Sequence, residues 1–271
     1  MKNLLALFFS IGFLNVAYTQ SEAAGSTYTH SVNKKIEQPI QDNVVVNGKK
    51  IVEPEMVFVE GGTFQMGSSS GESDEQPVHS VTLSSFSIGK YEVTQAQWKA
   101  VMGSTTGYIE SCDQCPVDEV SWNDVQEFIR KLNTKTGKNY RLPTEAEWEF
   151  AAKGGNKSKG YLYSGSHNIN SVAWYVGNSR EKVHPVGLKQ PNELGIHDMS
   201  GNVWEWCSDW YGNYKNHLEI NPKGASSDPY RVLRGGRWSY DAKFCRVTDR
   251  DKHPQDAIYQ YQGLRLLLPV E

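Results

Sequence analysis

The amino-acid sequence predicts an α+β fold in one loop-rich domain that spans residues 54–271. Three observations support this class. Helix signals are confined to the stretch between residues 94 and 153, and short strand candidates lie on both sides of it. The 24 glycines and 14 tyrosines accompany few long apolar runs, which is typical of a chain with many turns. The 271 residues can bury a substantial core, and no repeat of fixed period divides them.

The first 53 residues are predicted to lie outside this domain. Lys2 precedes apolar runs at 4–9 and 11–14, and Ala17-Tyr18-Thr19 follows them, which is the pattern of a signal peptide over residues 1–19. An uncleaved anchor is the alternative, although the apolar stretch is short for a spanning helix. Residues 20–53 are polar and without sustained periodicity, as in a flexible leader or linker. We therefore expect export to the periplasm, the cell surface or the extracellular space, with no membrane span in the mature form.

Short strands are expected at the start of the domain. Residues 56–59 and 63–66 form a candidate hairpin around Gly61-Gly62, because glycine adopts positive φ without strain. Residues 79–83 and 86–88 alternate in polarity as two further strands.

Three helices with readable starts follow. Thr94 with Gln97, and Thr144 with Glu147, match the capping box, and Ser121 can cap the helix between them. The middle helix carries apolar side chains at i, i+3, i+4 and i+7, which predicts one buried face. These side chains are Val125, Phe128, Ile129 and Leu132. Beyond residue 155 no long helix is expected, and the short strand candidates include 231–233 and 264–268.

The charge and cysteine content restrict the function. The net charge of −3 gives no electrostatic reason to bind nucleic acid, so we expect no nucleic-acid partner. The four cysteines Cys112, Cys115, Cys207 and Cys245 can form disulfides in an exported protein. Cys112-Asp-Gln-Cys115 is either a local bridge or a redox pair. We favour a structural bridge, because no predicted helix begins there to lower a thiol pKa.

Four motifs occur in order along the domain, and together they identify a family. The first motif covers residues 56–67 and is followed by Tyr91-Glu92-Val93-Thr94. The second covers 116–124 and includes Ser121-Trp122-Asn123-Asp124, and the third covers 140–151 and includes Arg141-Leu142-Pro143-Thr144-Glu145. The fourth covers 195–206, includes Gly201-Asn202-Val203-Trp204-Glu205, and is continued by 233–236 and 263–265. Their order and spacing resemble the formylglycine-generating enzyme, or sulfatase-modifying factor, domain over residues 54 to 269. The resemblance implies a loop-rich fold distantly similar to C-type lectins, usually with bound calcium.

The resemblance also implies a chemistry that this chain does not fully match. Enzymes of the family oxidise a sulfatase cysteine to formylglycine with molecular oxygen and with copper held by two cysteines. The first follows a double glycine by four residues and the second lies five further on; Tyr240 and Cys245 occupy these positions after Gly235-Gly236. A phenol is a hard, poor replacement for a thiolate that selects Cu(I), and Arg237 replaces a small hydroxyl residue. Copper is therefore expected only if the chain is catalytic, with Cys245 and the groove residue Trp204 in its active site.

Cys245 has a structural interpretation as well. Because the motif that contains Cys207 should pack against the C-terminal region, we favour a Cys207–Cys245 disulfide. A free buried thiol and a redox-active thiol remain as alternatives.

The calcium site that the resemblance implies matches this sequence better than the copper site does. The matching positions are Asp198, Gly201, Val203 and Glu205, which offer two carboxylates and two carbonyls to a hard cation. Alternatively, the two carboxylates only cap turns. The second calcium site of the family would lie near residues 168–178. We assign no ligands there, because the spacing of the residues departs from the family pattern.

A candidate binding surface lies in the predicted exposed loop over 237–262. Its aromatic and short polar side chains suit recognition of a protein or glycan ligand. These residues are Arg237, Tyr240, Asp241, Phe244, Asp249, Asp251, His253, Tyr259 and Tyr261.

Two functions therefore compete. One is an oxygen-dependent cysteine oxidase that matures sulfatases, which the motif coverage supports. The other is a calcium-stabilised binding or scaffold module without oxidase activity, favoured because Tyr240 removes a metal ligand while the retained motifs specify only a scaffold. In some lectin-like proteins a retroelement diversifies this C-terminal stretch, and a near-copy of the end of the gene would reveal that. Other exported members serve as structural parts of bacterial secretion and gliding machinery.

Overall fold

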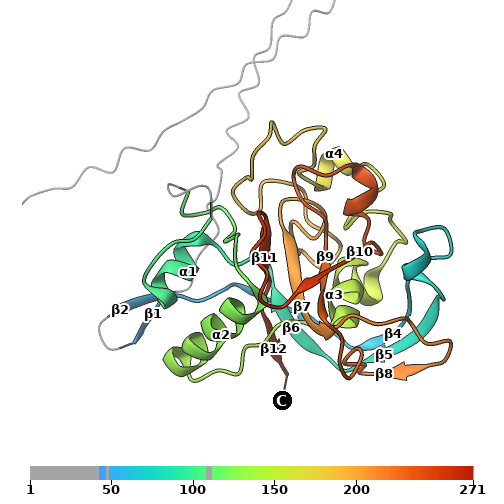
Figure 1. Cartoon of the computed structure of the whole chain (residues 1–271), viewed down its shortest axis with the longest axis horizontal. Helices are drawn as coiled ribbons and strands as arrows, with labels where there is room; N and C mark the ends of the chain where they lie inside the picture. The colour runs from blue at the N-terminus through green and yellow to red at the C-terminus, as the bar shows by residue number, and fades with distance from the viewer. Residues whose placement is uncertain (1–42, 47–48, 108–111, 271) are drawn as a thin grey trace, which may run out of the picture. The chain divides into compact units, whose positions relative to one another are not determined.

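The computed structural model describes residues 43–46, 49–107 and 112–270, and the predicted signal peptide over 1–19 lies outside them. Within that range the strands form four small sheets (Figure 1). The largest has the order β10 (Arg250–Pro254), β9 (Tyr230–Arg234), β7 (Trp204–Trp210) and β11 (Gln262–Leu264). Strand β9 is antiparallel to both of its neighbours, whereas β11 runs parallel to β7.

The three other sheets are smaller. One has the order β12 (Leu267–Pro269), β6 (Phe86–Gly89), β3 (Met56–Val59), and another β4 (Gly62–Met66), β5 (His79–Leu83), β8 (Glu219–Ile220). The hairpin of β1 (Asn43–Val46) and β2 (Lys49–Val52) falls in the segment interpreted from the sequence as a leader.

The three predicted helices are present as α1 (Gln95–Met102), α2 (Trp122–Thr136) and α3 (Glu145–Ala152). Each begins with a complete capping box, at Thr94, Ser121 and Thr144. Helix α2 buries the four apolar side chains that the periodicity indicated. A short α4 (Ile169–Val172) and the 3-10 turns η1 (Ser73–Glu75), η2 (Gly155–Lys157) and η3 (Ala242–Cys245) complete the helical segments. The predicted α+β class is confirmed.

The predicted hairpin between residues 56–59 and 63–66 is wrong. Strand β3 pairs with β6, and β4 pairs with β5, so the two strands belong to different sheets. Gly61 lies at the crossing between them. Its amide donates to the Ser85 hydroxyl at 3.0 Å, and a Cβ there would lie 2.4 Å from the Leu83 carbonyl oxygen. The glycine therefore permits a close approach of two chain segments instead of a tight turn.

The predicted strand over 264–268 is divided between two sheets. Strand β11 ends at Leu264 and β12 begins at Leu267. Arg265 lies between them, fully buried, and bonds the Glu205 carboxylate. A buried ion pair thus marks the place where the chain changes sheet.

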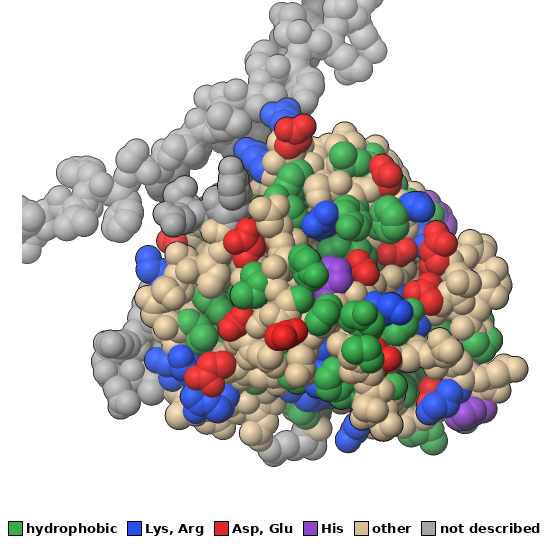
Figure 2. Space-filling view, viewed as in Figure 1, with side chains coloured by type: hydrophobic (Ala, Val, Ile, Leu, Met, Phe, Trp, Pro, Cys, Tyr) green, Lys and Arg blue, Asp and Glu red, His purple; other side chains and the backbone are tan. Residues whose placement is uncertain are grey.

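Two hydrophobic clusters form most of the core. One packs α3 against β4, β5 and β6, and includes Trp148, Phe150 and Ile88. The other packs α1 and α2 against β7 and β11, and includes Trp98, Phe128 and Trp206. Among the described residues, no helix has the length and apolar character that crossing a membrane requires. On the face in Figure 2, acidic and basic side chains are interspersed.

Candidate functional site

The double glycine after β9 packs closely against the segment that contains Cys245. Gly235 and Gly236 both have positive φ, at 100° and 78°. A Cβ on Gly236 would lie 2.5 Å from the Phe244 carbonyl oxygen and 2.9 Å from the Cys245 sulfur. Only glycine permits this packing of the loop after β9 against η3.

Tyr240 fills the position of the missing cysteine with aromatic contacts. Its ring lies 6.1 Å from the Trp204 ring in an edge-on arrangement and 5.1 Å from the Phe244 ring. The Arg237 guanidinium carbon stands 4.0 Å from the centre of the Tyr240 ring. The two departures from the family pattern therefore contact each other as a cation–π pair. Trp204 itself is a core residue that presents its ring to Tyr240.

Cys245 is a buried thiol. It is 0% exposed, and burial, with smaller contributions from Asp249 and Asp241, raises the pKa of its thiol to about 12. The Arg237 backbone N–H opposes the shift. At neutral pH the sulfur is protonated, and Tyr240 cannot supply a second thiolate. The residues present do not fit a copper ion held by two cysteines.

The described cysteines form one disulfide, between Cys112 and Cys115, which confirms the local bridge. The favoured Cys207–Cys245 bridge is wrong, because both are free buried thiols. Cys207 packs in the cluster around α3 and β5, whereas Cys245 packs with Tyr163 and Val172. The two sulfurs belong to separate parts of the interior, which motif order alone could not show.

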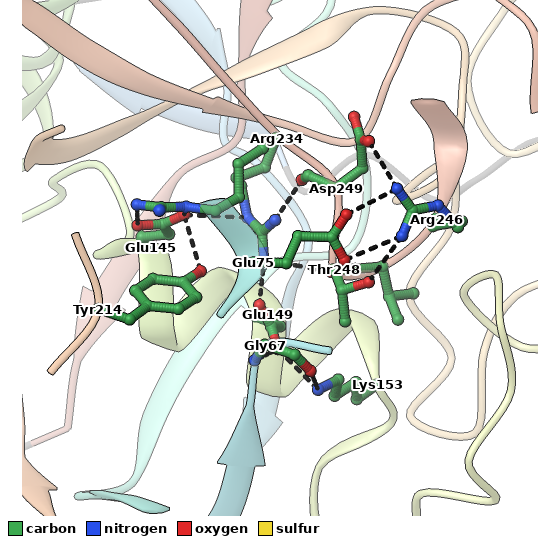
Figure 3. Close-up of polar contacts among 12 residues, drawn as sticks. Gly67, Glu75, Glu145, Glu149, Lys153, Tyr214, Arg234, Arg246, Thr248 and Asp249 are labelled. Carbon is green, nitrogen blue, oxygen red and sulfur yellow. Dashed lines mark hydrogen bonds and ion pairs between the residues drawn. The ribbon is translucent and has the colours of Figure 1, made fainter. Parts of the chain in front are cut away.

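The predicted binding surface is largely on the outside of the molecule. Asp241 and Tyr259 are exposed, and six further residues are half-buried: Arg237, Tyr240, Phe244, Asp251, His253 and Tyr261. We refer to these eight residues as the aromatic surface. Asp249 must be removed from the prediction, because it is only 3% exposed and its carboxylate accepts from Arg246 at 3.0 Å. Figure 3 shows Asp249 within a buried ion network.

Aromatic pairs and the disulfide underlie the surface. The Tyr261 ring lies 4.8 Å from Trp238, and the His253 ring lies 4.6 Å from Tyr259. Trp238 and Tyr261 pack in one cluster with both cysteines of the disulfide. The bridge thus stabilises the layer beneath the surface.

The predicted calcium segment is a strained turn with one unpaired oxygen. Asp198 and Gly201 have positive φ, and a Cβ on Gly201 would lie 2.1 Å from the Trp174 carbonyl oxygen. The Asp198 Oδ2 accepts from the Gly187 amide at 2.6 Å, while its buried Oδ1 has no hydrogen-bond partner. Glu205 instead binds Arg265 through both oxygens and accepts from the Trp148 indole at 2.7 Å.

Glu92 belongs to this site although the sequence did not indicate it. Its carboxylate accepts from the Asn202 side chain at 2.6 Å and from the Val203 amide at 3.2 Å. Burial, and then the charges of Asp198 and Glu205, raise its pKa well above the ordinary value. Burial also raises the pKa of Asp198 to about 6. Arg265 is the cation whose charge acts on both of these acids.

An excess of buried negative charge and an orphaned carboxylate oxygen fit a hard cation at Asp198. Glu205 contributes less than predicted, because Arg265 and Trp148 already occupy its oxygens. In the described part of the chain, no three Asp, Glu, His or Cys side chains form a ready metal cluster, so backbone carbonyls such as those of Gly201 and Val203 would have to complete the shell. Near 168–178 the amides of Asn168 and Asn178 serve local turns.

The comparisons with known proteins agree with the motif pattern. The family model for the sulfatase-modifying factor enzyme 1-like domain matches residues 41–269. Chaperone protein LppX of Paenibacillus barcinonensis is 35% identical over an alignment of 271 positions. That alignment covers 82% of this chain and 91% of the relative. The formylglycine-generating enzyme of Thermomonospora curvata is 29% identical over 78% of this chain and 92% of its own length. Among solved structures, Treponema denticola variable protein 1 superposes with a TM-score of 0.77 at 29% identity, over 86% of this chain and all of that one.

Proposed function

This chain belongs to the sulfatase-modifying factor enzyme 1-like family, and on that premise we propose that it is an exported, calcium-stabilised binding or scaffold module that lacks cysteine oxidase activity. The packing of Tyr240 against Trp204, Phe244 and Arg237 carries the proposal. It places an aromatic cluster where the family pattern requires a thiolate.

The same packing favours recognition over chemistry. Aromatic side chains give large contact areas at low conformational cost, and short polar side chains add adaptable hydrogen bonds. The aromatic surface combines both kinds, and its exposed Tyr259 is free to contact a partner. Two relatives carry names that describe other roles than oxidation, a chaperone and a variable protein. A protein or glycan ligand fits this surface.

Export and calcium have separate support. A disulfide between Cys112 and Cys115 is stable in an oxidising compartment such as the periplasm or the extracellular space. The unpaired Oδ1 of Asp198 supports calcium, because a bound cation would satisfy it and offset the repulsion from Glu92.

The oxidase reaction is the decisive test. The mature chain would be incubated with a sulfatase-type cysteine peptide, copper and reductant, beside the Thermomonospora curvata enzyme as the positive control. Mass spectrometry should detect aldehyde in the control only, and metal analysis should find no stoichiometric copper. Aldehyde formed by this chain would overturn the proposal and establish the oxidase.

The binding role is tested by photo-crosslinking in the producing cell. A photoreactive amino acid would replace Tyr259, which is 50% exposed, or Phe58 on β3, which is 58% exposed and lies outside the aromatic surface. We expect one discrete adduct from position 259 that position 58 does not give. Equal labelling from both positions would contradict a specific surface.

A further inference from the structure

A cavity of about 140 Å³ lies between the first turn of α3, the end of β7 and the loop over 212–225. Its walls include apolar side chains, among them Met66, Ala146 and Ala225, and the buried acids Glu145 and Asp209. Lys215, Asn213 and Gly224 are exposed and lie at its mouth. An engineered apolar cavity of about 150 Å³ holds benzene, so a ligand of about six heavy atoms fits.

Glu145 is fully compensated within this cavity. Arg250 binds its carboxylate through two nitrogens at 2.6 and 2.9 Å, and the Tyr214 hydroxyl donates to it at 3.2 Å. Arg234 lies 3.6 Å away on the other side, as Figure 3 shows. Glu219 is paired with Lys215 at 2.8 Å.

Asp209 differs from these acids because half of its carboxylate is unused. Its Oδ2 accepts from the Glu145 amide at 3.1 Å and from the Ser208 hydroxyl at 3.0 Å. Both of these hydrogen bonds reach Oδ2 and neither involves Oδ1, and the side chain, which lines the cavity, is only 3% exposed. A Cβ on Gly224, at the mouth, would lie 2.6 Å from the Asp209 Cβ and 3.0 Å from Oδ1, so the Asp209 side chain packs directly against the loop that lines the cavity.

We propose that this cavity binds the primary ammonium group of a short alkyl chain, with Asp209 Oδ1 as its anionic acceptor and the apolar walls around its methylenes. The ammonium supplies the positive charge and the N–H donor that the oxygen lacks. The ammonium group belongs either to a small free amine or to a lysine side chain of a bound protein.

Asp209 must be ionised to bind in this way. Burial, and then the Glu145 carboxylate, raise its pKa to about 7, so binding should strengthen about tenfold from pH 6 to pH 8. Titratable and charged groups surround it on every side: Glu145 and Glu147 of α3, Cys207 of β7, Arg231 of β9, Arg250 of β10, His79 of β5, Tyr214 and Lys215 of the loop, and Glu219 of β8.

Isothermal titration of the mature protein with n-butylammonium at pH 8 tests the proposal. We expect saturable one-to-one binding, no binding of n-butanol, and at least tenfold weaker binding to Asp209→Asn, which keeps an acceptor for the Glu145 amide. Asp256→Asn, an exposed carboxylate outside the cavity, should bind as the wild type does. Nα-acetyl-lysine amide binds as well if the source is a protein side chain, whereas butylammonium alone binds if it is a free amine.

Two further measurements keep the test decisive should Asp209→Asn fail to fold. Ala225→Leu fills the cavity without changing a charge and should abolish binding, and His79→Gln should retain the tenfold pH dependence. No saturable binding at pH 8, equal binding of butanol, or unchanged binding in Asp209→Asn would overturn the proposal.

Discussion

Replacing Arg234 by methionine should destabilise the protein more than any surface change. Its guanidinium is fully buried, bonds the buried Glu149 carboxylate and the Asp249 carbonyl, and donates to the Val247 carbonyl at 3.2 Å (Figure 3). Methionine retains an unbranched side chain about as long as the aliphatic part of arginine but supplies neither charge nor donor. Glu149 would retain Lys153 at 2.6 Å and the Gly67 amide at 2.8 Å.

The cost follows from the burial of the partners. Breaking a buried ion pair by removing one charge costs about 3–5 kcal/mol when the other charge stays buried without compensation. Because Lys153 and the Gly67 amide still compensate part of the Glu149 charge, the loss should lie near the lower end of that range. The free energy of unfolding of a domain is about 5–15 kcal/mol in total, so this substitution should remove a large part of the stability. With a urea m-value near 2–3 kcal/mol/M, the midpoint should fall by about 1–2 M.

Urea unfolding followed by tryptophan fluorescence measures this difference. The matched control is Arg130→Met, whose exposed pair with Glu127 should contribute nothing measurable. The double variant Arg234→Met with Glu149→Leu should recover about 1–3 kcal/mol of the loss, since it removes both charges. If the double variant is as unstable as the sum of the two single variants, the reasoning from the ion pair is refuted.

Three further predictions concern other parts of the molecule. Burial and Glu145 raise the pKa of Asp209 to about 7, so the folded protein binds its proton more tightly than the unfolded chain does. As pH rises from 4 to 8, the free energy of unfolding of the wild type should therefore fall by about 2–4 kcal/mol relative to that of Asp209→Asn. Parallel pH profiles of the two proteins in urea unfolding would contradict this. Calcium at about 100 times its Kd should raise the Tm by about 5–10 °C in the wild type but not in Asp198→Asn, as measured by calorimetry with a chelator control. Replacing Cys112 and Cys115 by serine should cost about 2 kcal/mol and alter the fluorescence of nearby Trp238, whereas Cys207→Ala should leave that signal unchanged.

Local features of the fold could be predicted from the sequence. The starts of α1, α2 and α3 depend on a hydroxyl and an acceptor three residues apart, which the sequence displays directly. The partners of β3 and β4 could not be predicted, because the tight turn suggested by Gly61-Gly62 is an inference from two residues, whereas pairing depends on contacts with residues 79–89.

The candidate site shows the same limit. Tyr240 and Arg237 could be identified by position after the double glycine, whereas their contact with each other could not. Glu92 was missed, since its bond to Asn202 joins residues 110 positions apart. Asp249 was misplaced because only the fold reveals that Arg246 and Arg234 surround it.

Five acidic motif residues show how the strong family resemblance is compatible with the proposed lack of oxidase activity. Each has an internal basic or amide partner, so each stabilises the scaffold whatever the chemistry at the surface. The pairs are Glu145 with Arg250, Glu147 with Arg141, Glu149 with Arg234, Glu205 with Arg265 and Glu92 with Asn202. Replacing one of them removes a buried contact, whereas Tyr240 takes part in aromatic packing against Trp204 and Phe244. These contacts are features of the scaffold, so the presence of the motifs does not by itself establish an activity, and the proposed lack of oxidase activity rests on the residues that follow Gly236.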